Sequence, residues 1–95
     1  MKLPANYNNL STLQRREVRK LYSEMQNWKC HHCGNHLMKE PTKEMLGMPI
    51  AFNLFPGGKD FLKYPIHLHH DHNTGMTIGA VHSRCNAILW QYHGE

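Results

Sequence analysis

Apolar residues recur with helical spacing in the first third of the chain. They fall at positions i, i+3, i+4 and i+7, which form one face of an α-helix, and they are Val18, Leu21, Tyr22 and Met25. Ser11 and Gln14 have the spacing of a capping box, in which each side chain satisfies a free N–H at the start of a helix. We therefore predict a helix over 11–28, preceded by an irregular polar arm over 1–10.

A different pattern near the C-terminus predicts two strands followed by a helix. Residues 66–71 alternate between two faces, residues 73–75 are turn formers, and residues 77–81 are rich in β-forming side chains. Ser83 is placed to cap a helix that runs to His93, and Gly94 would stop it. The inner face of this helix is predicted to carry three large side chains, those of Ile88, Leu89 and Tyr92.

The stretch between these two patterns has no regular periodicity. Prolines at positions 41, 49, 56 and 65 and the Gly57-Gly58 pair forbid a long helix or strand. We expect residues 37–65 to form an irregular insert, with at most one short helical turn or strand over 45–54. The 95 residues then make one small α+β domain over 1–95, whose core is the strand–turn–strand–helix unit of residues 66–93.

Charge and hydropathy narrow the possible partners. The net charge of +4 with neutral histidines suits a polyanionic partner, although many proteins without one share it. No apolar run approaches the roughly 20 residues of a membrane span, and a signal-peptide pattern is missing, so we expect no membrane partner and a cytoplasmic location. Four basic residues of the first helix lie off its apolar stripe, as a solvated face or a surface that contacts phosphate: Arg15, Arg16, Arg19 and Lys20.

Two short pairs of potential metal ligands stand far apart in the chain. Cys30 and Cys33 form one pair, and His82 and Cys85 form the other, each with two residues between its members. This spacing lets both side chains converge on one tetrahedral ion, and four such ligands close the site, as a structural zinc requires. We predict a structural Zn²⁺ that joins a knuckle over 29–36 to the C-terminal unit.

Two alternatives to this ligand set stay open. His31, His32 and His36 stand near the first pair and are alternatives to His82, although none has a cysteine at the same spacing. The cysteines could also be small core residues without a metal. Their odd number and short spacing argue against a disulfide framework and for a reducing compartment.

Histidines crowd into the stretch around the predicted turn. The run His69-His70-Asp71-His72 leads into Asn-Thr-Gly, and His-Ser-Arg-Cys-Asn follows at 82–86. This arrangement resembles the core of the HNH, or His-Me finger, endonucleases and is most similar to the branch of the phage recombination endonuclease VII. That branch has a zinc-bound Cys-x-x-Cys before the hairpin, an Asp-His-Asp-His run before a Thr-Gly turn, and Cys-x-x-Cys-Asn at the helix start. The resemblance covers about 28–93 without the insert, and it implies a zinc-stapled ββα-metal fold.

The resemblance also implies roles for the matching positions. His70 matches the general base, and His72 matches a histidine near the phosphate or the leaving group. His69 and Asn86 match the ligands of a catalytic divalent ion. The chemistry agrees, because an imidazole can accept the proton of an attacking water and a divalent ion can stabilise the departing oxygen. Asn86 directly follows the zinc ligand Cys85, so the structural metal would also fix its position.

The chain departs from that branch at two positions. His69 stands where the branch has Asp, which lowers the charge offered to the ion and shifts the preference from Mg²⁺ toward Mn²⁺ or Ni²⁺. His82 stands where the branch has Cys, so the zinc has one thiolate fewer.

The remaining polar residues of this region have simpler expected roles. Arg84 is expected to contact phosphate at the start of the last helix. Asp71 is expected to orient a neighbour or cap the turn. We expect His67 and His93 to be surface residues.

The expected function is that of a metal-dependent DNA endonuclease of the HNH type, which leaves 5′-phosphate and 3′-hydroxyl ends. We expect nicking of DNA with low specificity by a monomer or homodimer, with structural Zn²⁺ and catalytic Mg²⁺ or Mn²⁺. The resemblance further implies a bacteriophage source and hence the host cytoplasm. The alternatives are a non-catalytic zinc-stapled module that binds nucleic acid and a purely structural zinc protein.

Overall fold

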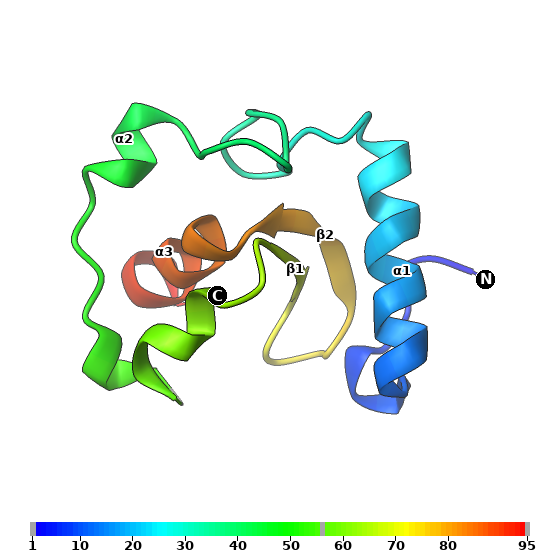
Figure 1. Ribbon diagram of the computed structural model, residues 1–95. Coiled ribbons are helices and arrows are strands. Elements are labelled where there is room, and N and C mark those ends of the chain that lie inside the picture. Colours follow the sequence, from blue (N-terminus) through cyan, green and yellow to red (C-terminus); the bar gives the residue numbers. More distant parts are fainter. Residues whose placement is uncertain (1, 56, 95) are drawn as a thin grey trace.

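A two-stranded hairpin with helices on either side forms the centre of the molecule (Figure 1). The computed structural model describes residues 2–55 and 57–94, and in this part the architecture is α+β as predicted. The helices and strands are α1 (Thr12–Met25), α2 (Lys43–Leu46), β1 (Ile66–His70), β2 (Thr77–His82) and α3 (Ser83–His93). Three short 3-10 helices accompany them: η1 (Tyr7–Asn9), η2 (Phe52–Leu54) and η3 (Gly58–Leu62).

Helix α1 begins as its sequence predicts and ends earlier. The capping box is confirmed: the Ser11 hydroxyl accepts from the Gln14 N–H at 3.2 Å, and the Gln14 side chain accepts from the Ser11 N–H at 2.9 Å. The helix stops at Met25 instead of residue 28. Asn27 and Trp28 take left-handed φ values of 53° and 60°, which a helix cannot continue through.

The buried face of α1 differs in part from the predicted stripe. Val18 and Tyr22 are buried in the core, but Met25 is 68% exposed, so its assignment to the stripe was wrong. Arg15 and Arg19 are half-buried instead of standing on a solvated face. Since Arg15, Val18, Arg19 and Tyr22 follow helical spacing, the helix turns two arginines toward the hairpin together with its apolar residues.

The hairpin turn is built as its residues predict. The Asp71 carboxylate accepts from the backbone N–H groups of Asn73 at 2.7 Å and Thr74 at 3.0 Å, so Asp71 caps the turn. Gly75 has a φ of 78°, and a Cβ there would lie 2.7 Å from the Asn6 side chain. The antiparallel register slips by one residue between His69 and His70, which shifts the end of β1 relative to β2.

The described part of the N-terminal arm has no long regular element, as predicted, and it is held against the hairpin by backbone hydrogen bonds. The Tyr7 N–H donates to the Gly75 carbonyl at 2.8 Å, and the Thr77 N–H donates to the Ala5 carbonyl at 2.9 Å. The arm thereby pairs with backbone groups at the start of β2 that a two-stranded sheet leaves open. This pairing carries Tyr7 to the end of the hairpin that holds His70.

The insert wraps around α3 and is fastened to it by Arg84 (Figure 1). Its α2 and 3-10 turns agree with the predicted lack of long regular elements. The Arg84 guanidinium donates to the carbonyls of Met45 and Leu46 at 3.2 Å and of Met48 at 3.0 Å. Three donors of Arg84 are thus taken up by the insert, a structural role that its predicted phosphate contact did not include.

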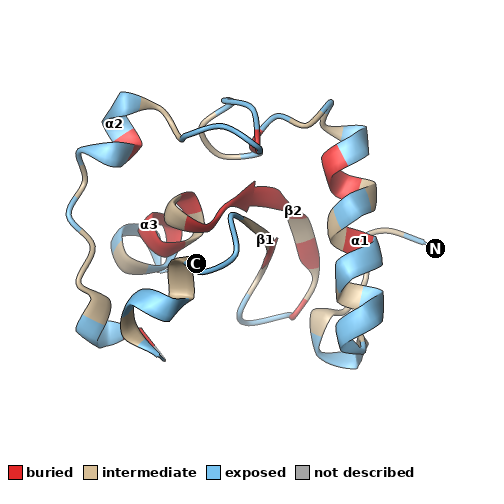
Figure 2. Ribbon diagram, viewed as in Figure 1, coloured by how far each residue is buried: buried red, intermediate tan, exposed pale blue. Residues whose placement is uncertain are grey.

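Helix α3 contributes the other wall of the core. Ile88 and Leu89 are buried as predicted, whereas Tyr92 is 44% exposed and donates its hydroxyl to the Pro49 carbonyl at 2.6 Å. Ser83 is buried in the first turn and does not cap it, and Gly94 ends the helix with a φ of 72°. Buried residues are concentrated on β2, on the first turns of α3 and on one face of α1 (Figure 2). Among residues 2–55 and 57–94, none of the helices has the length and apolar character needed to cross a lipid bilayer.

Replacing Arg84 by Met should loosen the insert. The change removes three hydrogen bonds from a charged donor group, and we expect the free energy of unfolding to fall by about 1–3 kcal/mol. Urea denaturation followed by circular dichroism measures this loss. Arg16→Met, at an exposed position of α1, is the matched control and should change stability by less than about 0.5 kcal/mol. Equal stabilities of the two variants would contradict the fastening role.

Candidate functional site

Three cysteines and one histidine form a compact group that could hold a metal ion. Their ligand atoms all lie within 4.8 Å of one another, and they are the four predicted residues Cys30, Cys33, His82 and Cys85. The Nδ1 atom of His82 lies 3.4 Å from the Cys33 sulfur and 3.7 Å from the Cys85 sulfur. A tetrahedral zinc with bonds of about 2.0–2.3 Å spaces its ligand atoms by about 3.3–3.8 Å. The group therefore fits a structural metal such as zinc.

The surroundings of this group also suit a cation. The Nε2–H of His82 donates to the His36 carbonyl at 2.9 Å, which leaves Nδ1 with a lone pair toward the sulfurs. A hydrogen bond from the Cys85 thiol, together with backbone N–H donors, lowers the pKa of Cys30 to about 4. The same contact and burial raise the pKa of Cys85. The Cys30 thiolate thus accepts a hydrogen bond from the Cys85 thiol, and a bound metal ion would take the place of that proton.

Local structure explains how the two ligand pairs meet. Gly34 takes a φ of 84°, which turns the knuckle back after Cys33, and the Gly34 N–H donates to the Cys30 carbonyl at 3.0 Å. The His31 N–H donates to the Ala80 carbonyl at 3.0 Å and thereby fastens the knuckle to β2. His82 ends β2 and Cys85 lies in the first turn of α3. A bound ion would therefore join the knuckle, the hairpin and α3.

His82→Ala should remove the bound metal. We expect one zinc per chain in the wild type and well below one in the variant, with a melting temperature lower by about 10 °C or more. Elemental mass spectrometry after dialysis and thermal unfolding measure the two effects. His32→Ala is the matched control, because His32 lies between Cys30 and Cys33 in the sequence and does not belong to the group. Loss of zinc from both variants, or from neither, would argue against His82 as the fourth ligand.

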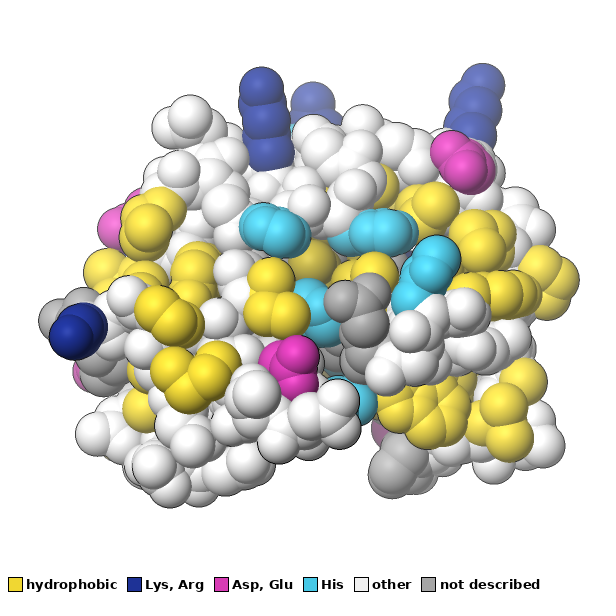
Figure 3. Space-filling model, turned by 180° about the vertical axis from the view of Figure 1, so that it is seen from behind, with side chains coloured by type: hydrophobic (Ala, Val, Ile, Leu, Met, Phe, Trp, Pro, Cys, Tyr) yellow, Lys and Arg dark blue, Asp and Glu magenta, His cyan; other side chains and the backbone are white. Residues whose placement is uncertain are grey.

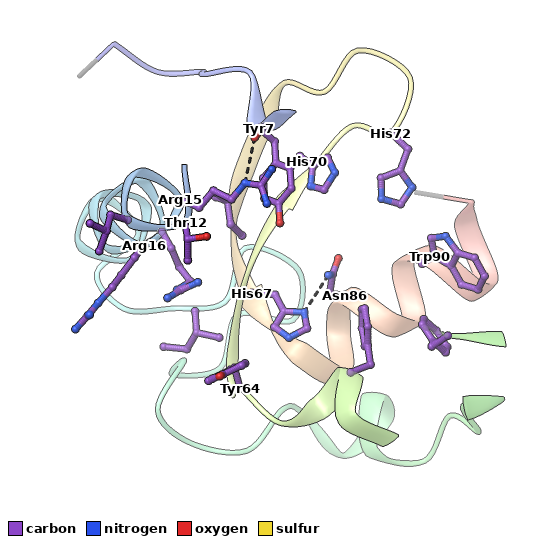
Figure 4. Close-up of a pocket in the computed structure, with 16 residues that line it drawn as sticks. Tyr7, Thr12, Arg15, Arg16, Tyr64, His67, His70, His72, Asn86 and Trp90 are labelled. Atoms are coloured by element: carbon purple, nitrogen blue, oxygen red, sulfur yellow. Dashed lines mark hydrogen bonds between the residues drawn. The ribbon is translucent and has the colours of Figure 1, made fainter. Parts of the chain in front are cut away.

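A cavity of about 730 Å³ opens along the free edge of β1, between α1 on one side and the insert and α3 on the other (Figure 4). Seen from the side opposite to Figure 1, histidine side chains gather around a hollow in the surface, with hydrophobic side chains beside them (Figure 3). His70, His72 and Asn86 line the cavity, so three of the four predicted catalytic residues meet there.

The fourth of these residues, His69, is placed differently. It is only 4% exposed and is not among the described residues that line the cavity. The strand is irregular between His69 and His70, so His67 and His70 both line the cavity although regular alternation would put them on opposite faces. The resemblance implies that His69 and Asn86 share one ion, but of these two only Asn86 is among the described residues that line the cavity.

His70 is held by an aromatic stack. Its ring lies parallel to the Tyr7 ring, with centroids 3.9 Å apart and planes 4° apart, and the Arg15 guanidinium lies 3.9 Å from the centre of the Tyr7 ring. The His72 ring is 5.0 Å away. Burial lowers the pKa of His70, and the charges of neighbouring His72 and Arg15 lower it further. His70 is therefore neutral at physiological pH and able to accept a proton.

His67 is part of the cavity, which corrects its prediction as a surface residue. The Nδ2–H of Asn86 donates to Nδ1 of His67 at 3.1 Å. Burial, helped by the charge of Arg19, lowers the pKa of His67 to about 4, which keeps the ring neutral as an acceptor. This bond turns the Asn86 carbonyl oxygen toward the space between His70 and His72 (Figure 4). His67 is thus a positioning residue, and no local sequence signal distinguished it from the other histidines of the run.

The cavity is positively charged. Arg15, Arg16 and Arg19 line it from α1, whereas Lys20 lies in a separate shallow hollow beside Glu17. No carboxylate is among its described lining residues. Of the four basic residues predicted to form one surface on the first helix, the three arginines therefore line the cavity and the lysine does not.

The comparisons with known proteins leave the geometry as the basis for function: no protein-family model, curated protein or solved structure matches the chain. The cavity combines a proton acceptor, an oriented amide oxygen and guanidinium groups. Such groups suit a phosphate-bearing ligand, because guanidinium binds phosphate oxygens with paired hydrogen bonds.

The low pKa of His67 makes stability depend on pH. In the unfolded chain this histidine takes up a proton near its ordinary pKa of 6.5, but in the folded chain only near 4. Acidification through 6.5 therefore favours the unfolded state. We expect the wild type to lose about 1 kcal/mol more than His67→Gln between about pH 7.5 and pH 6. Urea denaturation with excess zinc at both pH values measures this, and equal losses would contradict the buried neutral ring.

Proposed function

We propose that this protein is a metal-dependent endonuclease of the HNH type, which hydrolyses phosphodiester bonds in DNA. The observation that carries the proposal is that His70 and Asn86 face one cavity together with three arginines. The resemblance of residues 69–75 and 82–86 to the HNH core supports the same activity. A DNA phosphate placed against the arginines would bring a phosphorus atom next to a neutral histidine.

His70 is the proposed general base. Its ring would take a proton from the water that attacks phosphorus, and the bond to the 3′ oxygen would break, which leaves 5′-phosphate and 3′-hydroxyl ends. The stack on Tyr7 holds the imidazole in one orientation. The lowered pKa keeps it unprotonated before the reaction.

Asn86 and His72 are the residues proposed to hold the catalytic divalent ion. Such an ion, when bound, polarises the phosphate and stabilises the departing oxygen. The donors fit an ion with some affinity for nitrogen, because they are an amide oxygen and an imidazole, and no carboxylate is among the described lining residues. We therefore expect Mn²⁺ or Ni²⁺ to support activity better than Mg²⁺. His67 would hold Asn86 in place through their hydrogen bond.

A second candidate function is a zinc-stapled module that binds nucleic acid without cleaving it. The absence of carboxylates from the described cavity wall and the burial of His69 favour this candidate, since both reduce the ligands for a catalytic ion. It predicts salt-dependent binding through the arginines that is independent of His70.

His70→Ala should abolish most nicking of supercoiled plasmid. Loss of a general base costs about 100-fold or more in rate, so we expect at least that reduction in Mn²⁺, with bound zinc unchanged and the protein still folded. His93→Ala, at an exposed position outside the cavity, is the matched control and should cleave as the wild type does. Gel electrophoresis of time courses provides the rates.

Two results would count against the endonuclease. Equal rates for His70→Ala and the wild type would remove the base assignment. A wild type that binds DNA and leaves it intact in Mn²⁺, Ni²⁺ and Mg²⁺ would favour the binding module.

A further inference from the structure

Aromatic rings form the wall of the cavity opposite α1. Phe55 is 6% exposed, and its ring lies 4.7 Å from Phe61 and 4.8 Å from Trp90. Phe61 lies edge-on to His67, with ring centroids 4.9 Å apart. The insert thus supplies a fixed aromatic base, on which the indole of α3 rests. Neither the metal group nor the proposed hydrolysis needs this wall.

Two aromatic rings of the cavity remain open to the solvent, one on this wall and one at another margin. Trp90 is 37% exposed and Tyr64 is 67% exposed, and both line the cavity. Large aromatic side chains grouped at the surface are typical of binding sites, because exposing them costs free energy in the unliganded protein. Figure 4 shows Trp90 on the side of the space opposite to Arg16, with Tyr64 at another margin, below His67.

The cavity therefore has one cationic wall and one aromatic wall. Its volume of about 730 Å³ falls within the roughly 300–1,000 Å³ of ligand pockets. A polynucleotide offers a partner for each wall, with phosphates for the arginines and the flat faces of bases for the rings. In a duplex the bases stack on one another, so their faces are hidden. Only an unpaired base can stack on a protein ring.

We propose that the cavity binds unpaired nucleotides of single-stranded DNA, with a phosphate at the α1 arginines and bases against its two exposed rings, those of Trp90 and Tyr64. This inference deepens the proposed function, since it names single-stranded DNA as the substrate class. It rests on that function for the choice of DNA, whereas the binding step itself requires no hydrolysis. The strand that passes His70 would be an unpaired one.

Fluorescence anisotropy tests the inference in zinc-loaded protein without a catalytic ion. The probes are a short labelled single strand, the same strand with abasic sites in place of its central bases, and the same strand in a duplex. We expect the intact single strand to bind about tenfold or more tightly than either of the other probes. Trp90 fluorescence should also be quenched by the intact single strand.

Trp90→Ala should weaken binding of the intact single strand by about 5- to 100-fold. It should leave the affinity for the abasic and duplex probes nearly unchanged. Trp90→Phe is the matched control and should retain most of the affinity, because it keeps a ring at the wall. Tyr64→Ala, at a more exposed position, tests the second exposed ring of the cavity without risk to the core. Arg16→Ala should weaken the binding of all three probes and reduce the dependence of binding on salt concentration.

Equal or tighter binding of the duplex, or wild-type affinity of both Trp90→Ala and Tyr64→Ala, would overturn the inference. A dimer in sedimentation that Trp90→Ala dissociates would do so as well, since a second copy would then cover the wall. Single-strand preference without cleavage would sink the endonuclease and leave this inference standing. Cleavage by a protein that binds the duplex more tightly would support the endonuclease and overturn this inference.

Discussion

The geometry of the whole molecule depends on the group of three cysteines and one histidine. It lies where β2 passes directly into α3, with His82 on the strand and Cys85 on the helix. A small domain buries only a modest share of its apolar surface, and a metal bound across this junction would add to its stability. Asn86 follows Cys85, so whatever holds the sulfur also sets the direction of the amide. The cavity is thus linked to the metal group through one peptide bond.

Segments far apart in the chain build the cavity around that fixed point. The N-terminal arm brings Tyr7 onto His70, α1 brings arginines, and the insert brings aromatic rings. Arg84 is central to this arrangement, because it ties the insert to α3 through three carbonyls. The hairpin and α3 form the proposed chemical core, whereas the arm and the insert decide which ligand reaches it.

Sequence reasoning succeeded where a feature depends on neighbours along the chain. The capping box at Ser11, the Asp71 turn and the two ligand pairs each need only a few adjacent residues. It failed where a side chain has several possible partners that only the tertiary structure decides. Arg84 was expected to contact phosphate and binds backbone carbonyls of the insert, and His67 was expected at the surface and binds Asn86.

In the N-terminal arm, the tertiary structure decides the partners of backbone groups as well. Its polar sequence carries no strand signal, yet Ala5 and Tyr7 pair with the hairpin because β2 leaves hydrogen-bonding groups open there. The placement of His69 was missed for a related reason. A one-residue slip in the register decides which histidine of the run faces the cavity, and such a slip is invisible in composition.

The two metal sites of the proposed enzyme are kept apart by chemistry. The sulfur-rich group offers four soft ligands and no open position, which suits a permanent zinc and excludes a reacting phosphate. The cavity offers nitrogen and amide oxygen beside three arginines, with no carboxylate among its described lining residues. A divalent cation entering such a positive space is repelled until an anion accompanies it. In the proposed reaction the DNA phosphate supplies that negative charge, so the catalytic ion and the nucleic acid would bind together. The sulfur-rich group and the cavity would then not compete for the same metal ion.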